Sequence, residues 1–488
     1  MTRRTVFRLL VAVTLAWLAW AGWSLVGRSD PYELRVLDDL GAPIASAVID
    51  VDGSQVATTG SDGRADMVWT RSTTVLGVSA PGHIPRMLTL TDRPDEQFDV
   101  VLNARVLRGR VVDDAEGDGI EHARISAGSA EALSGEEGYY EIRGAEEGTV
   151  VVERPAWLPA EFEWDGGTGE SVVEMTPFTA RAVHIHGESV RDDIDGFIDM
   201  AMETELNALM IDLKDESGFV WYDTEVPIAN EVGAAKKAYE LSDTVARAHD
   251  LGLYVIGRLV LFNDPIAAVG KPELAVWDSE NNVPYEANGQ YFLDPTDPDS
   301  RQYGLDLAAE ACAAGLDEIQ FDYVRFPDNR RESAVFDGGV SPEIRLSTIS
   351  SFLSEAVALL RPMECAVAAD IFGYLTAATD DGGIGQRWEE IAGIVDVVSP
   401  MLYPSHYDND WYGFTNPNDH PAEMVDLALQ DGFERLTHQV VVRPWLQDFG
   451  YDASQVRAQI SSAESHGVGW MLWNAKSNVT VDALRPAE

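Results

Sequence analysis

From Ala182 to the C-terminus, short apolar runs alternate with amphipathic segments, and this alternation constrains the fold more than any other feature. Eight runs are predicted to be buried strands: Ala182–His186, Ala208–Lys214, Leu253–Leu261, Glu318–Val324, Cys365–Phe372, Val395–Leu402, Gln439–Trp445 and Gly469–Trp473. Strands that alternate with helices form parallel sheets, and eight such units in about 300 residues fit a (β/α)8 barrel better than an open sheet. We therefore predict an α/β fold of the TIM-barrel type for residues 181–488.

Two helix starts are predicted within this region. After the first strand, apolar residues recur at helical spacing at Val190, Ile194, Phe197, Ile198 and Ala201, and Ser189 is a suitable N-cap. The segment Asp294–Pro298 is predicted to begin the helix that precedes the fourth strand.

The region from Tyr32 to Thr179 has short alternating runs separated by Gly, Asp and Pro, which predicts all-β structure. It contains an internal repeat, in which Asp38, Gly41, Ile44 and Ala47 correspond to Asp114, Gly117, Ile120 and Ala123. This signature resembles the carboxypeptidase-regulatory-like β-sandwich, so we expect one sandwich module at residues 30–104 and a second at 105–180. Their role would be glycan contact and substrate positioning, or that of a rigid spacer.

Residues 1–29 carry a predicted targeting segment. The apolar run Leu9–Val26 follows three arginines, Arg3, Arg4 and Arg8, which is the pattern of a membrane-targeting sequence. Ala19–Ala21 could serve as a cleavage site of a secretory signal, but the tryptophans Trp17, Trp20 and Trp23 favour an uncleaved single-pass transmembrane anchor. Either outcome places the remaining chain outside the cytoplasm.

Composition excludes some partners. The 35 basic residues face 82 acidic ones, for a formal net charge of −47, so the chain would repel nucleic acid. A hydrophobic content of 45% is too high for a disordered chain. The two cysteines, Cys312 and Cys365, lack metal-binding spacing; we expect them to be buried thiols, with a disulfide as the alternative.

Catalytic side chains of a TIM barrel occupy the C-terminal ends of its strands and the loops that follow. Polar and aromatic residues gather at these predicted positions, and we expect them to bind substrate: Asp212, Lys214, Arg258, Tyr323, Arg325, Tyr403, His406, Tyr407, Arg443, Trp445, Gln447, Asp448, Trp473 and Asn474. Aromatic rings beside hydrogen-bonding groups are typical of saccharide subsites. The arginines could receive carboxylated sugars or pair with the aspartates.

Six segments of the barrel, in order, resemble a glycosyl hydrolase family known as domain of unknown function 4015: Ile256–Pro265, Asp317–Pro327, Ala369–Gly373, Ser399–Tyr407, Val442–Phe449 and Trp470–Asn474. The resemblance covers about residues 182 to 485. It implies a (β/α)8 domain with glycosidase activity and brings no known substrate. In the same resemblance, the loops Asp380–Gln386 and Gly413–His420 are lid or substrate loops, or else plain connections.

Glycoside hydrolysis needs two carboxyl groups, and we predict Asp322 and Asp370 as the catalytic pair. Both lie in apolar strands, where an unpaired carboxylate is costly, and the strand is expected to continue beyond Asp322. Adjacent strands would place the two groups roughly 5–7 Å apart, nearer the retaining than the inverting spacing. Asp322 is then the nucleophile and Asp370 the general acid/base, with Asp212 as a reserve candidate.

Two other classes of function are alternatives to a glycosidase: a metal-dependent amidohydrolase and a non-catalytic carbohydrate-binding protein. His184 and His186 share a face of the first strand, as in metal-dependent amidohydrolases, but of the further ligands only His406 is available, and Asn474 occupies the last ligand position. We therefore expect no metal and no cofactor. A non-catalytic carbohydrate-binding envelope protein is the other alternative. The sequence predicts a polysaccharide or oligosaccharide partner without identifying it as the cell's own envelope or an external polymer, and predicts no oligomeric state.

Overall fold

The computed structural model describes residues 30–69, 74–115, 117–328 and 330–487 of the chain. The predicted targeting segment at residues 1–29, including Leu9–Val26, lies outside the described residues. Among the described residues, no helix has both the length and the apolar character needed to cross a membrane. Contacts divide the chain into two units, one made of residues up to Val112 with Gly119–Val152 and Pro159–Glu174, the other of Asp113–Asp118, Glu153–Leu158 and Met175–Glu488.

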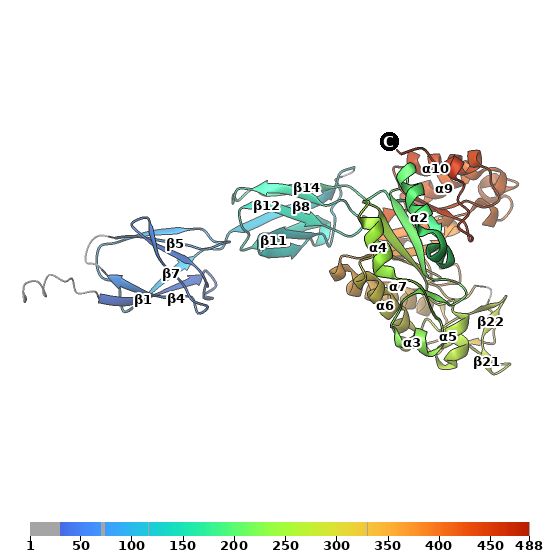
Figure 1. Cartoon of the computed structure of the whole chain (residues 1–488), viewed down its shortest axis with the longest axis horizontal. Helices are drawn as coiled ribbons and strands as arrows, with labels where there is room; N and C mark the ends of the chain where they lie inside the picture. Colours follow the sequence, from blue (N-terminus) through green and yellow to red (C-terminus); the bar gives the residue numbers. More distant parts are fainter. Residues whose placement is uncertain (1–29, 70–73, 116, 329, 488) are drawn as a thin grey trace, which may run out of the picture. The chain divides into compact units, whose positions relative to one another are not determined.

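The first part of the chain folds into sandwich-like pairs of sheets, coloured blue and teal in Figure 1. Sheets β4-β1-β7 and β3-β2-β5-β6 contain β1 (Asp30–Asp38), β2 (Val48–Val51), β3 (Ser54–Thr58), β4 (Arg64–Trp69), β5 (Thr74–Ser79), β6 (Arg86–Leu90) and β7 (Gln97–Leu102). Along β4 buried and exposed residues alternate, as expected where one face of a sheet meets a core.

The same topology recurs in the next sheets. Sheets β11-β8-β14 and β10-β9-β12-β13 contain β8 (Val106–Asp113), β9 (Arg124–Ala127), β10 (Ala130–Leu133), β11 (Tyr139–Arg143), β12 (Gly148–Glu153), β13 (Ala160–Trp164) and β14 (Glu170–Met175). Adding seven to each strand number of the first two sheets gives the strand order of these two sheets. The two halves of the sequence repeat therefore have the same strand order.

One correspondence within the repeat is wrong by one residue. Asp38 accepts backbone hydrogen bonds from the turn that follows β1, including one from Leu40 N at 2.9 Å. In the second copy this position is held by Asp113, which accepts from Ala115 N at 2.9 Å, and not by the predicted Asp114. The turn after Asp113 is one residue longer, which shifts the aspartate relative to the rest of the repeat.

Eight parallel strands close the C-terminal barrel, as predicted. The order is β15-β30-β29-β27-β26-β24-β19-β16, and β16 pairs with β15 to close the ring. The strands are β15 (Arg181–Ile185), β16 (Ala208–Lys214), β19 (Tyr254–Val260), β24 (Glu318–Asp322), β26 (Ala366–Phe372), β27 (Val397–Leu402), β28 (Val441–Val442) with β29 (Trp445–Gln447), and β30 (Trp470–Trp473). Every residue of β16 is buried, as expected for a parallel strand covered on both faces.

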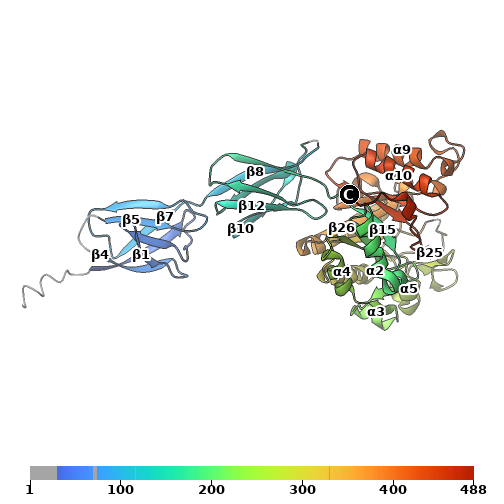
Figure 2. The same cartoon turned by 45° about the horizontal axis from the view of Figure 1, so that its top comes forward.

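Helices surround the barrel strands in both views (Figures 1 and 2). They are α2 (Gly187–Glu203), α3 (Pro227–Glu231), α4 (Leu241–His249), α5 (Pro265–Gly270), α6 (Pro298–Ala313), α7 (Pro342–Leu360), α8 (Trp388–Ala392), α9 (Pro421–Glu434) and α10 (Ala453–Ser465). Short accessory strands are β17 (Val220–Tyr222), β18 (Ala235–Tyr239), β20 (Trp277–Asp278), β21 (Val283–Pro284), β22 (Glu286–Ala287), β23 (Gln290–Tyr291) and β25 (Ala334–Val335).

Three local predictions can be compared with these bounds. The start of α6 is confirmed, because the Asp297 side chain caps it and Pro298 is its first residue. The start of α2 is wrong, because the N-cap is His186 and not Ser189; the imidazole of His186 accepts from the Glu188 N–H, a role that sequence rules assign to shorter side chains. Strand β24 ends at Asp322 instead of continuing to Val324.

The expectation of free cysteines is wrong, because Cys312 at the end of α6 and Cys365 just before β26 form a disulfide. Their Cα atoms lie 5.9 Å apart, although 53 positions separate them in the sequence. Both residues are buried, as predicted. Their disulfide links the end of α6 to the start of β26.

Breaking this disulfide should destabilise the barrel by about 4 kcal/mol, because it frees a loop of 53 residues in the unfolded chain. Urea unfolding followed by near-UV circular dichroism, with and without reductant, measures the effect without altering packing. The variant C312A/C365A should have a lowered midpoint that reductant no longer changes. Equal midpoints for the oxidised and reduced parent would contradict the prediction.

Candidate active site

The C-terminal ends of the barrel strands surround a cavity of about 510 Å3. Its lining residues are Glu216, Asp322, Tyr323, Arg325, Asp370, Phe372, Gly373, Tyr374, Met401, Tyr403, His406, Tyr407, Asp408, Trp411, Trp445 and Trp473. Nine of the predicted site residues are in this set: Asp322, Asp370, Tyr323, Arg325, Tyr403, His406, Tyr407, Trp445 and Trp473. The two predicted catalytic carboxyl groups therefore face one common space.

Arg258 on β19 connects the carboxylates at the base of this cavity. Its Nη1 donates to Asp212 Oδ1 at 2.9 Å, its Nη2 to Asp322 Oδ2 at 2.5 Å, and it also pairs with Glu216. The guanidinium lies 4.5 Å from the centre of the Trp473 ring. Burial alone lowers the pKa of Arg258, but the surrounding carboxylates outweigh that effect and raise it well above its usual value.

The geometry of Asp322 follows from the end of its strand. Oδ1 accepts the backbone N–H of Tyr323 at 2.7 Å, while Oδ2 accepts both Nε and Nη2 of Arg258. Tyr323 has a φ of +51°, a left-handed conformation that is rare outside glycine. The chain thus turns sharply after Asp322, which leaves the carboxylate at the cavity and not within a continuing strand.

Asp370 on β26 has a contrasting environment. Its Oδ1 accepts from Trp445 Nε1 at 2.5 Å and from Gln320, whereas its buried Oδ2 has no hydrogen-bond partner among the described residues. Burial, followed by the negative charge of Asp322, raises the pKa of Asp370 well above its usual value. Two neighbouring carboxyl groups are thus distinguished, one ion-paired and one favoured in the protonated form.

Asp212 supports the site from behind and does not line the cavity. Its Oδ1 lies 3.0 Å from His184 Nε2 as well as near Arg258, and the His184 ring packs against Trp473 with centroids 4.2 Å apart. Burial raises the pKa of Asp212, but His184 and Arg258 together bring it to about 2. Asp212 therefore orients Arg258. This ion-paired structural role fits its position better than direct contact with the substrate.

Aromatic rings cover much of the cavity wall. Trp445 and Trp473 pack edge to face at 5.4 Å, and Trp411 contacts Tyr407 at 5.6 Å and Tyr374 at 6.4 Å. Such surfaces accept the apolar faces of sugar rings. Arg325 lies 4.8 Å from the ring centres of both Tyr323 and Phe372, and burial lowers the pKa of His406, which favours its neutral form.

Seven predicted site residues lie outside the cavity lining: Asp212 and Arg258, described above, and Lys214, Arg443, Gln447, Asp448 and Asn474. Lys214 points instead to Asp264, with Nζ 3.0 Å from Oδ2, in a fully buried pair. Arg443 lies 2.7 Å from Glu318, the first residue of β24, and so occupies the N-terminal end of the barrel. The seventh strand is interrupted at Arg443-Pro444, where proline cannot donate to a ladder, but its register with β27 is the same on both sides of the interruption.

The other three of these residues organise loops around the site. Gln447 accepts from Ser405 N at 3.1 Å and donates to Phe449 O at 2.9 Å. Asp448 accepts from Thr480 N at 3.0 Å, and Asn474 donates to the backbone oxygen of Asp448 at 2.6 Å. Substrate contact by these side chains stays a prediction that the geometry does not favour.

Sequence reasoning missed several lining residues, including Glu216, Phe372, Tyr374, Asp408 and Trp411. Glu216 follows directly after the predicted group Asp212–Asp215, so its position could have indicated it. Trp411 belongs to a short 3-10 turn, Trp411–Gly413, whose position cannot be inferred from strand spacing. Gln320, which orients Asp370, could have been found from strand alternation, because Gln320 and Asp322 face the same side of β24.

The two predicted substrate loops are anchored. In Asp380–Gln386, Asp381 pairs with Arg345 at 2.6 Å, and Gln386 donates to the backbone oxygen of Asp370 at 2.9 Å. In Gly413–His420, the Phe414 and His420 rings stack with centroids 4.2 Å apart. The first loop thus supports Asp370 and β26 through the hydrogen bond from Gln386.

The pKa of Asp370 predicts how its replacement changes stability with pH. An aspartate whose pKa is higher in the folded than in the unfolded state stabilises the folded protein fully at pH values below its unfolded-state pKa of about 4. This contribution to the free energy of unfolding is lost as pH rises, at up to about 1.4 kcal/mol per pH unit. D370N should therefore become more stable relative to the parent as pH rises above about 4. Urea unfolding between pH 4 and 8 measures the difference.

Asp381 provides a control of opposite sign, because Arg345 and backbone donors lower its pKa against the effect of burial. Its contribution is lost only as pH falls below about 4, so the cost of D381N should stay constant between pH 4 and 8, unlike that of D370N. Parallel curves for D370N and the parent would contradict a raised pKa of Asp370.

Residues 182–479 match the model of domain of unknown function 4015, described as a putative glycosyl hydrolase domain. No curated protein matches the chain. Among solved structures, a hypothetical protein from Ruminiclostridium thermocellum is 36% identical over 38% of this chain and 96% of its own, with a TM-score of 0.35.

Two further solved structures are similar to this chain at low identity. The glycoside hydrolase domain of PgaB (BpsB) from Bordetella bronchiseptica is 14% identical, covering 61% of this chain and 95% of its own, with a TM-score of 0.46. The spore cortex-lytic enzyme SleL from Bacillus cereus is 11% identical, covering 62% and 73%, with a TM-score of 0.39. The family match alone spans more than half of the chain, and the protein therefore belongs to the putative glycosyl hydrolase family of domain of unknown function 4015.

Proposed function

We propose that the protein hydrolyses glycosidic bonds of an extracytoplasmic polysaccharide, using Asp322 and Asp370 as its two catalytic carboxyl groups. The observation that carries this proposal is the pairing, in one cavity, of an ion-paired Asp322 with a buried Asp370 whose pKa is raised well above its usual value. A glycosidase needs this difference, because one group must donate a proton while the other is ionised.

In the proposed mechanism, Asp370 donates its proton to the oxygen of the leaving sugar as that bond breaks. Asp322 attacks the anomeric carbon and forms a covalent glycosyl intermediate, and Arg258 holds its carboxylate in position. Asp370, now ionised, then removes a proton from the water that releases the sugar. This retaining course is supported by the adjacency of strands β24 and β26.

The location of the protein is part of the proposal. A disulfide between Cys312 and Cys365 is typical of proteins that fold in an oxidising compartment, in agreement with export directed by the arginine-flanked run Leu9–Val26. We propose a single-pass membrane anchor with the barrel outside the cytoplasm. Membrane fractionation and N-terminal sequencing of the mature chain would distinguish the anchor from a cleaved signal.

Replacement of each aspartate should separate the two roles. D370N should lower kcat/KM on a polysaccharide by about 10^3-fold, but much less on an aryl glycoside whose leaving group needs no proton. D322N should abolish cleavage of both substrates, because neither can form the covalent intermediate. Reducing-end release from a panel of bacterial polysaccharides and aryl glycoside assays measure these effects.

Asp306 on the outer helix α6 is a suitable control, since it is exposed and accepts a hydrogen bond from Gln302 of the same helix at 2.7 Å. D306N should cleave like the parent. If D322N and D370N also cleave like the parent, the assigned pair is wrong. If the parent binds a glycan but never cleaves it, the protein is a carbohydrate-binding envelope protein instead.

Trp411 should contribute a sugar-binding platform. It is half-buried at the cavity, packs against Tyr374 and Tyr407, and is followed by Tyr412, whose hydroxyl donates to Asp431 at 2.6 Å and anchors the turn. W411A should raise KM about tenfold with little change in kcat, whereas W411F should retain most of the affinity. A fall in kcat at unchanged KM would contradict a role in binding.

A further inference from the structure

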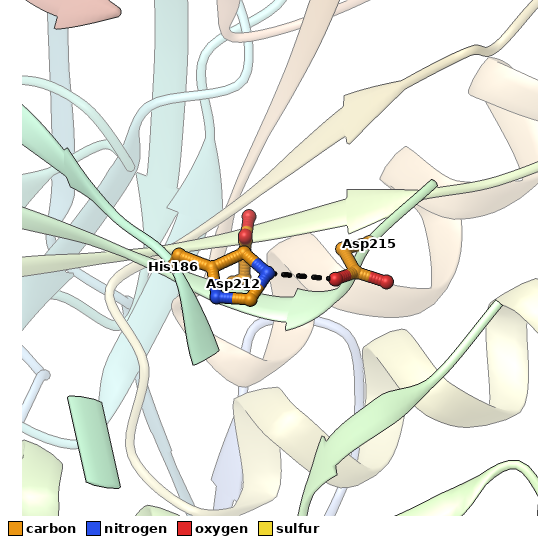
Figure 3. Close-up of side chains that lie close together, drawn as sticks. All are labelled: His186, Asp212 and Asp215. Atoms are coloured by element: carbon orange, nitrogen blue, oxygen red, sulfur yellow. Dashed lines mark hydrogen bonds and ion pairs between the residues drawn. The ribbon is translucent and has the colours of Figure 1, made fainter. Parts of the chain in front are cut away.

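A cluster of one imidazole and two carboxylates lies beside the cavity, where the first two barrel strands end. His186 follows β15, Asp212 lies on β16, and Asp215 is the first residue after β16. One ligand atom from each residue lies within 4.8 Å of the other two. Figure 3 shows the Asp215 carboxylate facing the His186 ring, with the Asp212 side chain next to that ring.

Each side chain in this cluster has an atom that its other contacts leave available. Asp212 is fully buried, and only its Oδ1 is held by Arg258; its buried Oδ2 has no hydrogen-bond partner among the described residues. Asp215 uses Oδ1 to accept from Ser217 N at 3.0 Å and turns Oδ2 to His186 Nε2 at 2.9 Å. A buried carboxylate oxygen without a partner is costly, so a ligand at this point would satisfy it.

The charges around the cluster are unbalanced. Four carboxylates, those of Asp212, Asp215, Glu216 and Asp322, belong to this cluster or to the adjoining network of Arg258. Arg258 pairs with three of them, Asp212, Glu216 and Asp322, while the imidazoles of His184 and His186 pair with Asp212 and Asp215. Lys214 does not contribute, because it pairs with Asp264. The excess of negative charge favours a bound cation.

We propose that His186, Asp212 and Asp215 bind one divalent transition-metal ion such as Zn2+ or Mn2+. An imidazole nitrogen with two carboxylate oxygens suits such ions better than Mg2+ or Ca2+, which prefer oxygen ligands alone. With metal–ligand distances of about 2.0–2.2 Å, ligand atoms around one ion lie roughly 3.3 Å apart. The His186–Asp215 pair at 2.9 Å therefore opens slightly, and the Asp212 oxygen, within 4.8 Å of both ligand atoms, moves closer. Arg258 remains on the opposite oxygen of Asp212.

Coordination replaces the hydrogen bond between His186 Nε2 and Asp215 Oδ2, and it changes one further contact. His186 Nδ1 now accepts from Glu188 N at 3.2 Å, the long bond that caps α2. When Nε2 binds the ion, the ring proton lies on Nδ1, so the Glu188 N–H turns to solvent, where the first N–H groups of a helix are readily hydrated. His186 keeps a quarter of its side chain exposed, which gives the ion a path into the site.

The ion has a structural role in this proposal. None of its three ligands lines the cavity, and it differs from the amidohydrolase arrangement because His184 faces Asp212 and the backbone oxygen of Asn474. It links the end of β15 to the turn after β16, which carries Glu216 to its pair with Arg258. The inference does not depend on glycosidase activity.

Zn2+ and Mn2+ titrations of the EDTA-treated full chain test this site. Isothermal calorimetry should find one ion per chain, and thermal unfolding should shift upward by about 5 °C at a hundredfold excess over Kd. Mg2+ or Ca2+ at the same concentration should give a smaller shift. D215N and H186Q should each lose at least tenfold in affinity, and metal-free melting curves verify their folding; if D215N does not fold, H186Q decides.

Asp426 offers a matched control, because it forms a His–Asp pair with His466 at 2.8 Å that no second carboxylate among the described residues completes to a three-ligand cluster. D426N should bind the ion like the parent. The proposal is overturned if the parent binds no stoichiometric ion, if H186Q binds with parental affinity, or if D426N loses binding as H186Q does. An equal shift with Ca2+ or Mg2+ would overturn the assignment to a transition metal.

Discussion

The buried guanidinium of Arg258 is the interaction on which the site depends. It pairs with Asp212 and Asp322 inside the barrel and with Glu216 at the cavity. Removal of a counter-ion that several buried carboxylates share leaves their charges without compensation. Trp473 packs over it and His184 holds Asp212 from the other side. The position of the proposed nucleophile is therefore set by a network, and not by its own strand alone.

The same network explains why neighbouring aspartates differ. Asp322 receives two hydrogen bonds from Arg258, whereas Asp370 receives its hydrogen bonds from the neutral groups of Gln320 and Trp445. Burial without a dedicated counter-ion raises the pKa of Asp370, and the charge of Asp322 raises it further. One barrel interior thus produces an ion-paired carboxylate and a carboxyl group with a raised pKa from the same residue type, and acid-assisted glycoside cleavage requires such a difference.

Most of the barrel and part of the site could be predicted from sequence, because buried parallel strands are continuous apolar runs whose C-terminal ends are identifiable. The predictions fail where the chain departs from regular geometry. Arg443 pairs with Glu318 at the N-terminal end of the barrel, and the left-handed Tyr323 ends β24 early. Lys214 was assigned to the substrate because strand spacing does not reveal a buried partner such as Asp264.

The sequence by itself determined the eight-strand alternation, the repeated sandwich topology and the two carboxyl groups at strand ends, since each depends on local periodicity. Only the tertiary structure decided which side chains share a cavity, because that depends on contacts between residues far apart in the chain. It joined Cys312 to Cys365, brought Trp411 to the cavity wall, and placed His186 beside Asp212 and Asp215. Pairing partners and protonation preferences follow from these long-range contacts and from burial, neither of which a local pattern contains.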